Sequence, residues 1–185
     1  MTRRENIFLI ATQDTVPLAD KVAAELRVVC TPMIRKQFAD GEIYHAFPCD
    51  VSGRDIVIIA ATHTDAAQQE LIDLIAGGRY WNARSVNVVI PYLGYSTMER
   101  SKPESGEIPK GITRTRQIFR TRPNYVAFVD LHSEAVLHAH SGEVRTRHLW
   151  TESLAAQKIR DMNLKDYVLV SPDYGFSKRV TSAAR

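Results

Sequence analysis

An aspartate and a histidine stand one residue apart at the end of the apolar run 125–129, in the segment Asp130-Leu131-His132. The run predicts a buried strand, and in open α/β sheets ligands bind just outside the carboxyl ends of the strands. Because side chains alternate along an extended segment, we expect Asp130 and His132 to face the same way. A carboxylate beside an imidazole suits a divalent metal ion, alone or with a phosphorylated ligand. A histidine that satisfies a strand-end carbonyl group is an equally open alternative.

A second pair of histidines, His138 and His140, follows closely and raises the question of zinc. A structural zinc site needs three or four ligands in a tetrahedral array. The two cysteines, Cys30 and Cys49, are not placed to supply them. We therefore expect exposed loop histidines rather than a zinc site.

Asp173 is a second acid at the carboxyl end of an apolar run, here 168–170. Pro172 fixes the exit of the chain, and Gly175 permits a tight turn into a helix. Backbone amides at the start of a helix attract anions, so Asp173 is a candidate for the same metal and phosphate chemistry. An ordinary N-cap aspartate is the alternative.

Two more segments carry groups that suit a nucleotide. Phe38-Ala39-Asp40-Gly41-Glu42 places two carboxylates and an aromatic ring around a glycine, which suits a base and a ribose or an ordinary turn before a strand. The long loop 92–111 carries Arg100 and Lys102 beyond a strand end. Their charge and hydrogen-bond geometry suit a polyphosphate, and a solvated loop is the alternative.

Apolar runs and helical periodicity alternate along the chain and predict an α/β fold with a parallel sheet flanked by helices. Strands are expected over 7–11, 42–47, 56–60, 86–90, 125–129 and 168–170. Few residues remain to form neighbouring strands for the last of these, so the chain is expected to stop inside a second α/β unit. The predicted domains are 1–150, complete, and 151–185, the start of a second similar domain.

The helices between these strands have recognisable inward faces. The residues expected to point inward are Leu18, Val22 and Leu26 after Pro17; Ala67, Leu71, Leu74 and Ile75; Ile112, Ile118 and Phe119; and Leu154, Ala155, Ile159 and Met162 after Thr151.

Composition bounds the function. The 185 residues are 44% apolar and 24% charged with a formal charge of +3, which does not suggest bulk nucleic-acid binding. Two interpretations of the arginines at 114, 116, 120 and 122 remain open, namely phosphate binding and a solvated helix face. Two cysteines suggest a reducing compartment. There is no apolar stretch of membrane-spanning length and no signal-type start, so we expect a cytoplasmic protein without a membrane partner.

Four motifs in order resemble those of the ribose-phosphate pyrophosphokinase family. They are Phe-Ala-Asp-Gly-Glu at 38–42, Ile-Pro-Tyr-Leu-Gly-Tyr at 90–95, Val-Asp-Leu-His at 129–132 and Val-Ser-Pro-Asp at 170–173. The resemblance implies two α/β halves of type I phosphoribosyltransferase kind, which assemble into dimers or hexamers. It implies transfer of the β,γ-diphosphate of ATP to the 1-hydroxyl of ribose 5-phosphate, with Mg²⁺.

The resemblance also assigns roles by position. His132 and Asp173, with Asp130 beside them, match the magnesium site. The segment that contacts the ATP base, often across a subunit boundary, is matched by Phe38, Asp40, Gly41 and Glu42. Arg100 matches a basic residue of the ATP loop.

Two departures from the family pattern matter. Ser96, Thr97, Met98 and Glu99 stand where Ala-Arg-Gln-Asp is usual, so Thr97 and Met98 are the least certain ATP contacts. Thr97 cannot supply the missing charge, although Arg100 or Lys102 can. The Asp-Asp and Thr-Gly-Gly loop for ribose 5-phosphate and the catalytic basic residues are expected beyond Arg185.

These departures leave two rival functions open. One is a non-catalytic regulatory homologue that assembles with an active synthetase. The other is a simple phosphoribosyltransferase, which the presence of segment 38–42 disfavours.

Overall fold

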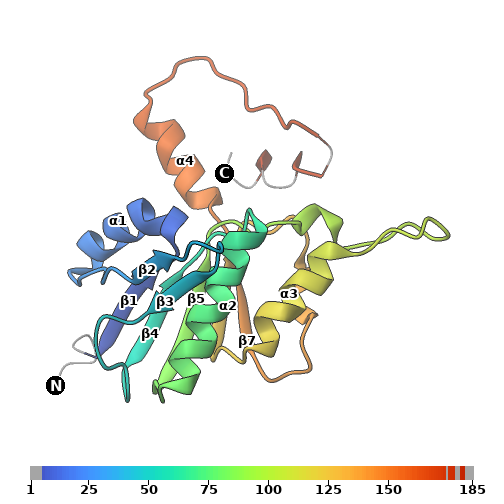
Figure 1. Cartoon of the computed structure of the whole chain (residues 1–185). Coiled ribbons are helices and arrows are strands. Elements are labelled where there is room, and N and C mark those ends of the chain that lie inside the picture. The colour runs from blue at the N-terminus through green and yellow to red at the C-terminus, as the bar shows by residue number, and fades with distance from the viewer. Residues whose placement is uncertain (1–5, 174, 178–179, 182–185) are drawn as a thin grey trace. The chain divides into compact units, whose positions relative to one another are not determined.

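Buried apolar runs form a five-stranded sheet in the order β1-β4-β5-β6-β7 (Figure 1). The strands are β1 (Ile7–Ala11), β4 (Asp55–Ile59), β5 (Ser85–Ile90), β6 (Tyr125–Val129) and β7 (Arg145–Leu149). β1 pairs with β4, β4 with β5 and β5 with β6, all in parallel. The predicted α/β fold with a parallel sheet flanked by helices is therefore confirmed.

The computed structural model describes residues 6–173, 175–177 and 180–181. The chain divides into two units, Met1–His148 and Leu149–Arg185. The first unit contains the sheet. The second contains α4 (Glu152–Asp161), for which Thr151 is the N-cap residue. Among the residues that the structure describes, no helix is both long and apolar enough to cross a membrane.

Helices cover both faces of the sheet. On one face, α2 (Asp65–Tyr80) and α3 (Lys110–Arg120) bury a large apolar core that includes Ile10, Ile58 and Phe128. On the other face, α1 (Val16–Leu26) packs on a smaller cluster that includes Leu9 and Ile59. Successive residues of β1 and β4 thus enter opposite cores, as the alternation of side chains along a strand requires.

The inward face of α1 differs from the prediction. Leu18 and Leu26 are exposed, whereas Ala19 and Ala23 are buried. Val22 packs against the same cluster, as predicted. The packed face also contains the two alanines, whose small side chains allow the helix to lie close to β1 and β4. On α2 the prediction is confirmed: Ala67, Leu71, Leu74 and Ile75 are all buried.

Within its described residues, the structure contains two strands that were not predicted and lacks one that was. A separate antiparallel hairpin contains β2 (Ile34–Gln37), which was not predicted, and β3 (Ile43–Ala46). β7 was also missed. The run 168–170 forms no strand, and Val168 and Val170 are 83% and 80% exposed. A strand is stable only when neighbours pair with it, and the described residues provide no partner strand for this run.

Phe119 of α3 tests the main core. Its ring is 1% exposed and packs edge-on against Phe128 at a centroid separation of 6.2 Å. Phe119→Ala should lower the free energy of unfolding by about 3–5 kcal/mol in urea denaturation, because it removes apolar contacts and leaves a cavity. Tyr80→Ala on α2 is the control, since this side chain is 75% exposed and should change stability by less than about 0.5 kcal/mol. Equal effects of the two substitutions would contradict this assignment of the core.

Candidate functional site

The loops that follow β1, β4, β5 and β6 meet along one edge of the sheet, because parallel strands all end on the same side. We call these loops the carboxyl edge; they comprise residues 12–15, 60–64, 91–98 and 130–132. Hydrogen bonds join neighbouring loops. Thr15 Oγ1 donates to Ile59 O (2.6 Å), and the amide of Gly94 donates to Thr62 Oγ1 (2.9 Å).

A steric constraint explains why a glycine stands at position 94. A Cβ atom at Gly94 would overlap the carbonyl oxygen of Thr62, which is a backbone atom that cannot move aside. The two loops therefore approach each other more closely than any side chain allows. This contact fixes where the chain leaves β5 and enters the loop that starts at Tyr95.

The Asp130-Leu131-His132 segment forms a turn rather than the extended continuation that we expected. β6 ends at Val129, and Asp130 has φ +46°, in the left-handed region. Leu131 is 2% exposed and enters the main core, whereas His132 is exposed and Asp130 half-buried. The strand alternation used in the prediction therefore does not apply here, and the turn itself sets the direction of the two polar side chains.

Two side chains hold the backbone of this turn. The amide of Leu131 donates to Nε2 of His148 (2.9 Å), and the amide of His132 donates to Oγ of Ser96 (3.3 Å). Ser96 begins η2 (Ser96–Met98), so the structure brings the turn next to the loop expected to contact ATP. Sequence patterns predicted neither contact, because both link distant parts of the chain.

The turn offers one carboxylate and one imidazole toward a metal ion. No group of three or more His, Cys, Asp or Glu residues that could hold a metal occurs in the described part of the chain. Mg²⁺ does not need such a cage, since it is commonly held by one or two carboxylates together with substrate phosphates and water. Two donors, one of them an imidazole, are too few for a structural zinc site, and they could serve Mg²⁺ only together with oxygen atoms of phosphate and water.

The segment 38–42 forms the turn of the β2–β3 hairpin. Gly41 has φ +93°, its amide donates to Phe38 O (3.0 Å), and Asp40 Oδ1 accepts from the amide of Glu42 (3.1 Å). The Asp-Gly pair is thus explained by the turn. Phe38 is 52% exposed, so its ring presents an aromatic face to solvent.

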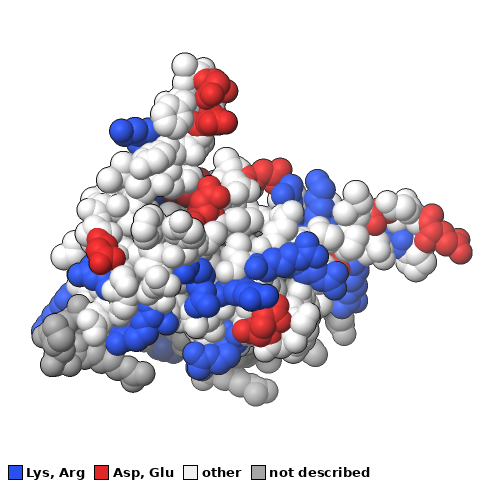
Figure 2. Space-filling model, turned by 60° about the horizontal axis from the view of Figure 1, so that its bottom comes forward, with Lys and Arg blue, Asp and Glu red and all other residues white. Residues whose placement is uncertain are grey.

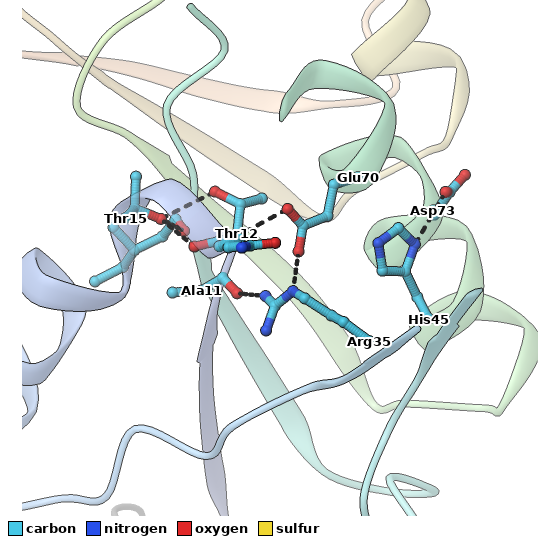
Figure 3. A network of polar contacts seen from close by, with 9 residues as sticks. Ala11, Thr12, Thr15, Arg35, His45, Glu70 and Asp73 are labelled. Atoms are coloured by element: carbon cyan, nitrogen blue, oxygen red, sulfur yellow. Dashed lines mark hydrogen bonds and ion pairs between the residues drawn. The ribbon is translucent and has the colours of Figure 1, made fainter. Parts of the chain in front are cut away.

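Both strands of the hairpin are anchored to α2 (Figure 3). Arg35 of β2 donates through Nε to Glu70 Oε1 (2.6 Å) and through Nη2 to Ala11 O (2.6 Å). Glu70, only 8% exposed, also accepts from the amide of Gln13 (3.0 Å). On β3, His45 Nδ1 lies 3.3 Å from a carboxylate oxygen of Asp73. The buried carboxylate of Glu70 therefore joins the hairpin to the first loop of the carboxyl edge.

A largely apolar hollow of 710 Å³ lies between the hairpin and α2. Its lining includes Met33, Ile43, Phe47, Leu74 and Trp81. None of its lining residues belongs to the carboxyl edge, so this cavity is not the site to which the polar motifs point.

The loop after β5 has an ordered base and an exposed arm. At its base, the hydroxyl of Tyr95 donates to Asp65 (2.8 Å), and this bond together with partial burial raises the pKa of Tyr95. Arg114 donates to the other oxygen of Asp65 (3.0 Å). The arm, residues 99–109, projects away from the sheet (Figure 1). The side chains of Arg100 and Lys102 are each 82% exposed.

The residues predicted to contact ATP lie on η2 and at the start of this arm. Thr97 and Met98 are exposed on η2, and Arg100 lies 3.6 Å from Glu99 in an ion pair. The carboxylate of Glu99 is largely buried, whereas the guanidinium of Arg100 is exposed and so remains accessible to an anionic ligand.

Figure 2 shows Lys and Arg side chains interspersed with several acidic groups on the face that it presents. Of the arginines weighed above, Arg114 is paired with Asp65, whereas Arg116, Arg120 and Arg122 are exposed. For these three, a solvated surface is the simpler explanation.

The remaining candidates are placed as follows. Asp173 lies in the second unit, where its Oδ1 accepts from the amide of Phe176 (2.8 Å), which is the capping role considered above. His138 is exposed on η3 (Glu134–His138). His140 packs edge-on against Phe119 at 5.0 Å, and its Nδ1 accepts from the amide of Gly142 (2.8 Å). His138 is thus exposed as expected, whereas His140 is half-buried and packs against the core.

Comparison with known proteins gives a consistent result. Residues 7–110 match the model of the N-terminal domain of ribose phosphate pyrophosphokinase. A ribose-phosphate pyrophosphokinase of Thermoplasma acidophilum is 33% identical over 180 residues, 95% of this chain and 59% of the relative. One of Gloeobacter violaceus is 30% identical, over 98% of this chain and 54% of the relative. The chain thus spans a little more than half the length of these curated relatives.

A solved structure shows the same fold. The phosphoribosylpyrophosphate synthetase of Mycobacterium smegmatis superposes with a TM-score of 0.83 at 24% identity. The match covers 97% of this chain and 60% of that protein.

The Arg35–Glu70 pair gives a test of how the hairpin is held. Arg35→Met leaves the carboxylate of Glu70 without its cation, and urea denaturation should show a loss of about 3–5 kcal/mol. The double change Arg35→Met with Glu70→Gln should lose less, because no uncompensated charge remains buried. Arg116→Met, at an exposed arginine, is the control. The proposed anchor would be wrong if Arg35→Met cost no more than this control.

Proposed function

Because the chain belongs to the ribose-phosphate pyrophosphokinase family, we propose that it supplies the ATP side of a diphosphate transfer from ATP to ribose 5-phosphate. The product would be phosphoribosyl pyrophosphate, a precursor for nucleotide biosynthesis. The observation that carries the proposal is the hydrogen bond between the amide of His132 and Ser96. It brings a carboxylate–imidazole turn next to a loop with exposed basic side chains at a carboxyl edge, where α/β folds bind ligands.

Each group has a part in binding ATP. Asp130 and His132 would hold Mg²⁺. When bound, Mg²⁺ neutralises phosphate charge and orients the transferred group. Arg100 and Lys102 would contact the phosphates through their exposed side chains.

The hairpin turn would bind the base. The exposed ring of Phe38 offers a stacking surface, and the carboxylates of Asp40 and Glu42 can accept hydrogen bonds from an exocyclic amine or ribose. By family position, we propose that it serves the site of a neighbouring copy in a homo-oligomer, as the resemblance implies.

The reaction asks for positioning and charge neutralisation rather than a covalent nucleophile. The 1-hydroxyl of the sugar attacks the β-phosphorus of ATP in line with the departing AMP. We propose that the carboxyl edge supplies groups for the phosphates and the metal. Groups for the 5-phosphate of the sugar are not assigned to this chain.

A regulatory homologue is the second candidate. Thr97 stands where the family pattern has an arginine, and its neutral side chain is exposed on η2. A chain that assembles with an active synthetase without binding ATP itself would not need this cation.

Calorimetric titration with ATP and Mg²⁺ separates the two candidates. The unsubstituted chain should bind ATP only in the presence of Mg²⁺. His132→Ala should weaken this binding by at least about tenfold, because it removes a metal ligand. His138→Ala, an exposed histidine nearby, should leave the affinity unchanged. Failure of the unsubstituted chain to bind ATP would favour the regulatory homologue, and unchanged affinity in His132→Ala would make this histidine structural.

Synthetase turnover gives a separate prediction. The 185-residue sequence contains neither an Asp-Asp pair nor a Thr-Gly-Gly triplet, which the resemblance links to ribose 5-phosphate. We expect AMP formation dependent on ribose 5-phosphate to stay near the background rate for this chain. A turnover in the usual enzymatic range of roughly 1–1,000 per second would show that the sugar is bound by other residues.

A further inference from the structure

A buried histidine supports the turn that carries Asp130 and His132. His148 lies on β7, the strand next to β6, and its side chain is only 4% exposed. Its Nε2 accepts a hydrogen bond from the amide of Leu131 (2.9 Å), and its Nδ1 lies 2.9 Å from Oε1 of Glu134.

These two contacts define the tautomer of the imidazole. The amide of Leu131 can only donate, so Nε2 must carry a lone pair and no proton. The proton of the neutral ring then sits on Nδ1, where the carboxylate of Glu134 accepts it. Glu134 therefore orients His148 so that the ring presents an acceptor to the turn.

The turn needs this hydrogen-bond acceptor because the backbone conformation at Asp130 is energetically unfavourable. Asp130 adopts φ +46°, a conformation that costs a residue other than glycine free energy and persists only when its surroundings enforce it. The bond to the Leu131 amide falls directly after this residue and directly before His132. Burial of the Leu131 side chain and the bond from the His132 amide to Ser96 hold the other side of the turn.

We propose that His148 is a positioning residue for the metal and phosphate site: its Nε2 fixes the Leu131 amide and thereby the directions of Asp130 and His132. The role in ATP binding rests on the proposed function. The role in shaping the turn rests only on the contacts described above. His148 would touch neither the metal ion nor the nucleotide.

Amide substitutions separate the two nitrogen positions of the ring. In His148→Gln, the side-chain oxygen can occupy the place of Nε2 and accept from Leu131. In His148→Asn, the shorter side chain reaches only the place of Nδ1. His148→Leu offers no acceptor at either place. His138→Leu is the matched control, because His138 is an exposed histidine of the same region.

The first measurement is hydrogen exchange of the Leu131 and His132 amides by NMR, together with the ¹⁵N shifts of the His148 ring. We expect the tautomer with hydrogen on Nδ1 in the unsubstituted chain. Exchange at both amides should rise at least tenfold in the Leu and Asn variants and return toward the original rate in the Gln variant. Unchanged exchange in His148→Leu, or protonated Nε2 in the unsubstituted chain, would overturn the proposal.

The second measurement is broadening of the His132 signals by Mn²⁺, with and without ATP. We expect metal affinity to fall at least tenfold in His148→Leu and to recover in His148→Gln. Altered exchange with unaltered metal affinity would overturn the role at the metal site. If the unsubstituted chain binds neither Mn²⁺ nor ATP while exchange depends on His148, the proposed function fails and the support of the turn stands.

A surface variant keeps the test valid if His148→Leu does not fold. The side chain of Glu134 is 59% exposed, so Glu134→Ala should preserve the fold. It removes the acceptor that selects the tautomer, and the ¹⁵N shifts should then report a mixture of the two neutral forms. A single unchanged tautomer in this variant would contradict the orienting role of Glu134.

Discussion

The parallel pairing of β1, β4, β5 and β6 is the constraint on which the rest of the structure depends. Parallel strands must all return on the outside of the sheet, so their carboxyl ends, and the loops that leave them, share one edge. Helices cover both faces, and the strands are consequently apolar along most of their length. Polar chemistry is thereby confined to the loops, which is where the aspartate, the histidine and the basic side chains lie.

The edge is held together mainly by bonds that involve the backbone. Thr62 accepts from Gly94, Ser96 accepts from His132, and His148 accepts from Leu131. The hairpin is attached by a different device, the buried pair of Arg35 and Glu70. Charge pairs in a protected environment are costly to break, so the hairpin is fixed near the sheet while its turn remains exposed.

Local sequence patterns predicted the central elements well, because each central strand is a continuous apolar run. They also placed Asp130 and His132 at the correct edge, since that position follows from strand parallelism alone. β7 was missed because its Arg-Thr-Arg-His-Leu sequence is mostly polar. On α1, Val22 was predicted correctly, but Ala19 and Ala23 were missed, because alanine carries little hydrophobic signal although it packs closely.

Other features depend on contacts between distant residues. The left-handed conformation of Asp130 and the support from His148, 17 residues after Leu131, have no local signature. The run 168–170 has the composition of a strand, but pairing requires neighbours that its own sequence does not encode. The roles of Phe38 and Arg100 in binding a nucleotide likewise stay predictions, because a static set of side chains does not reveal a ligand.

The close contact of Gly94 with the Thr62 carbonyl has a consequence for how this sequence can diverge. Gly94 and Thr62 meet through main-chain atoms, so a side chain at position 94 would push apart the loops that follow β4 and β5. The side chains of Thr97 and Met98 are exposed. Substitutions at these two positions should therefore leave the paths of both loops unchanged, whereas a single substitution at Gly94 should displace them.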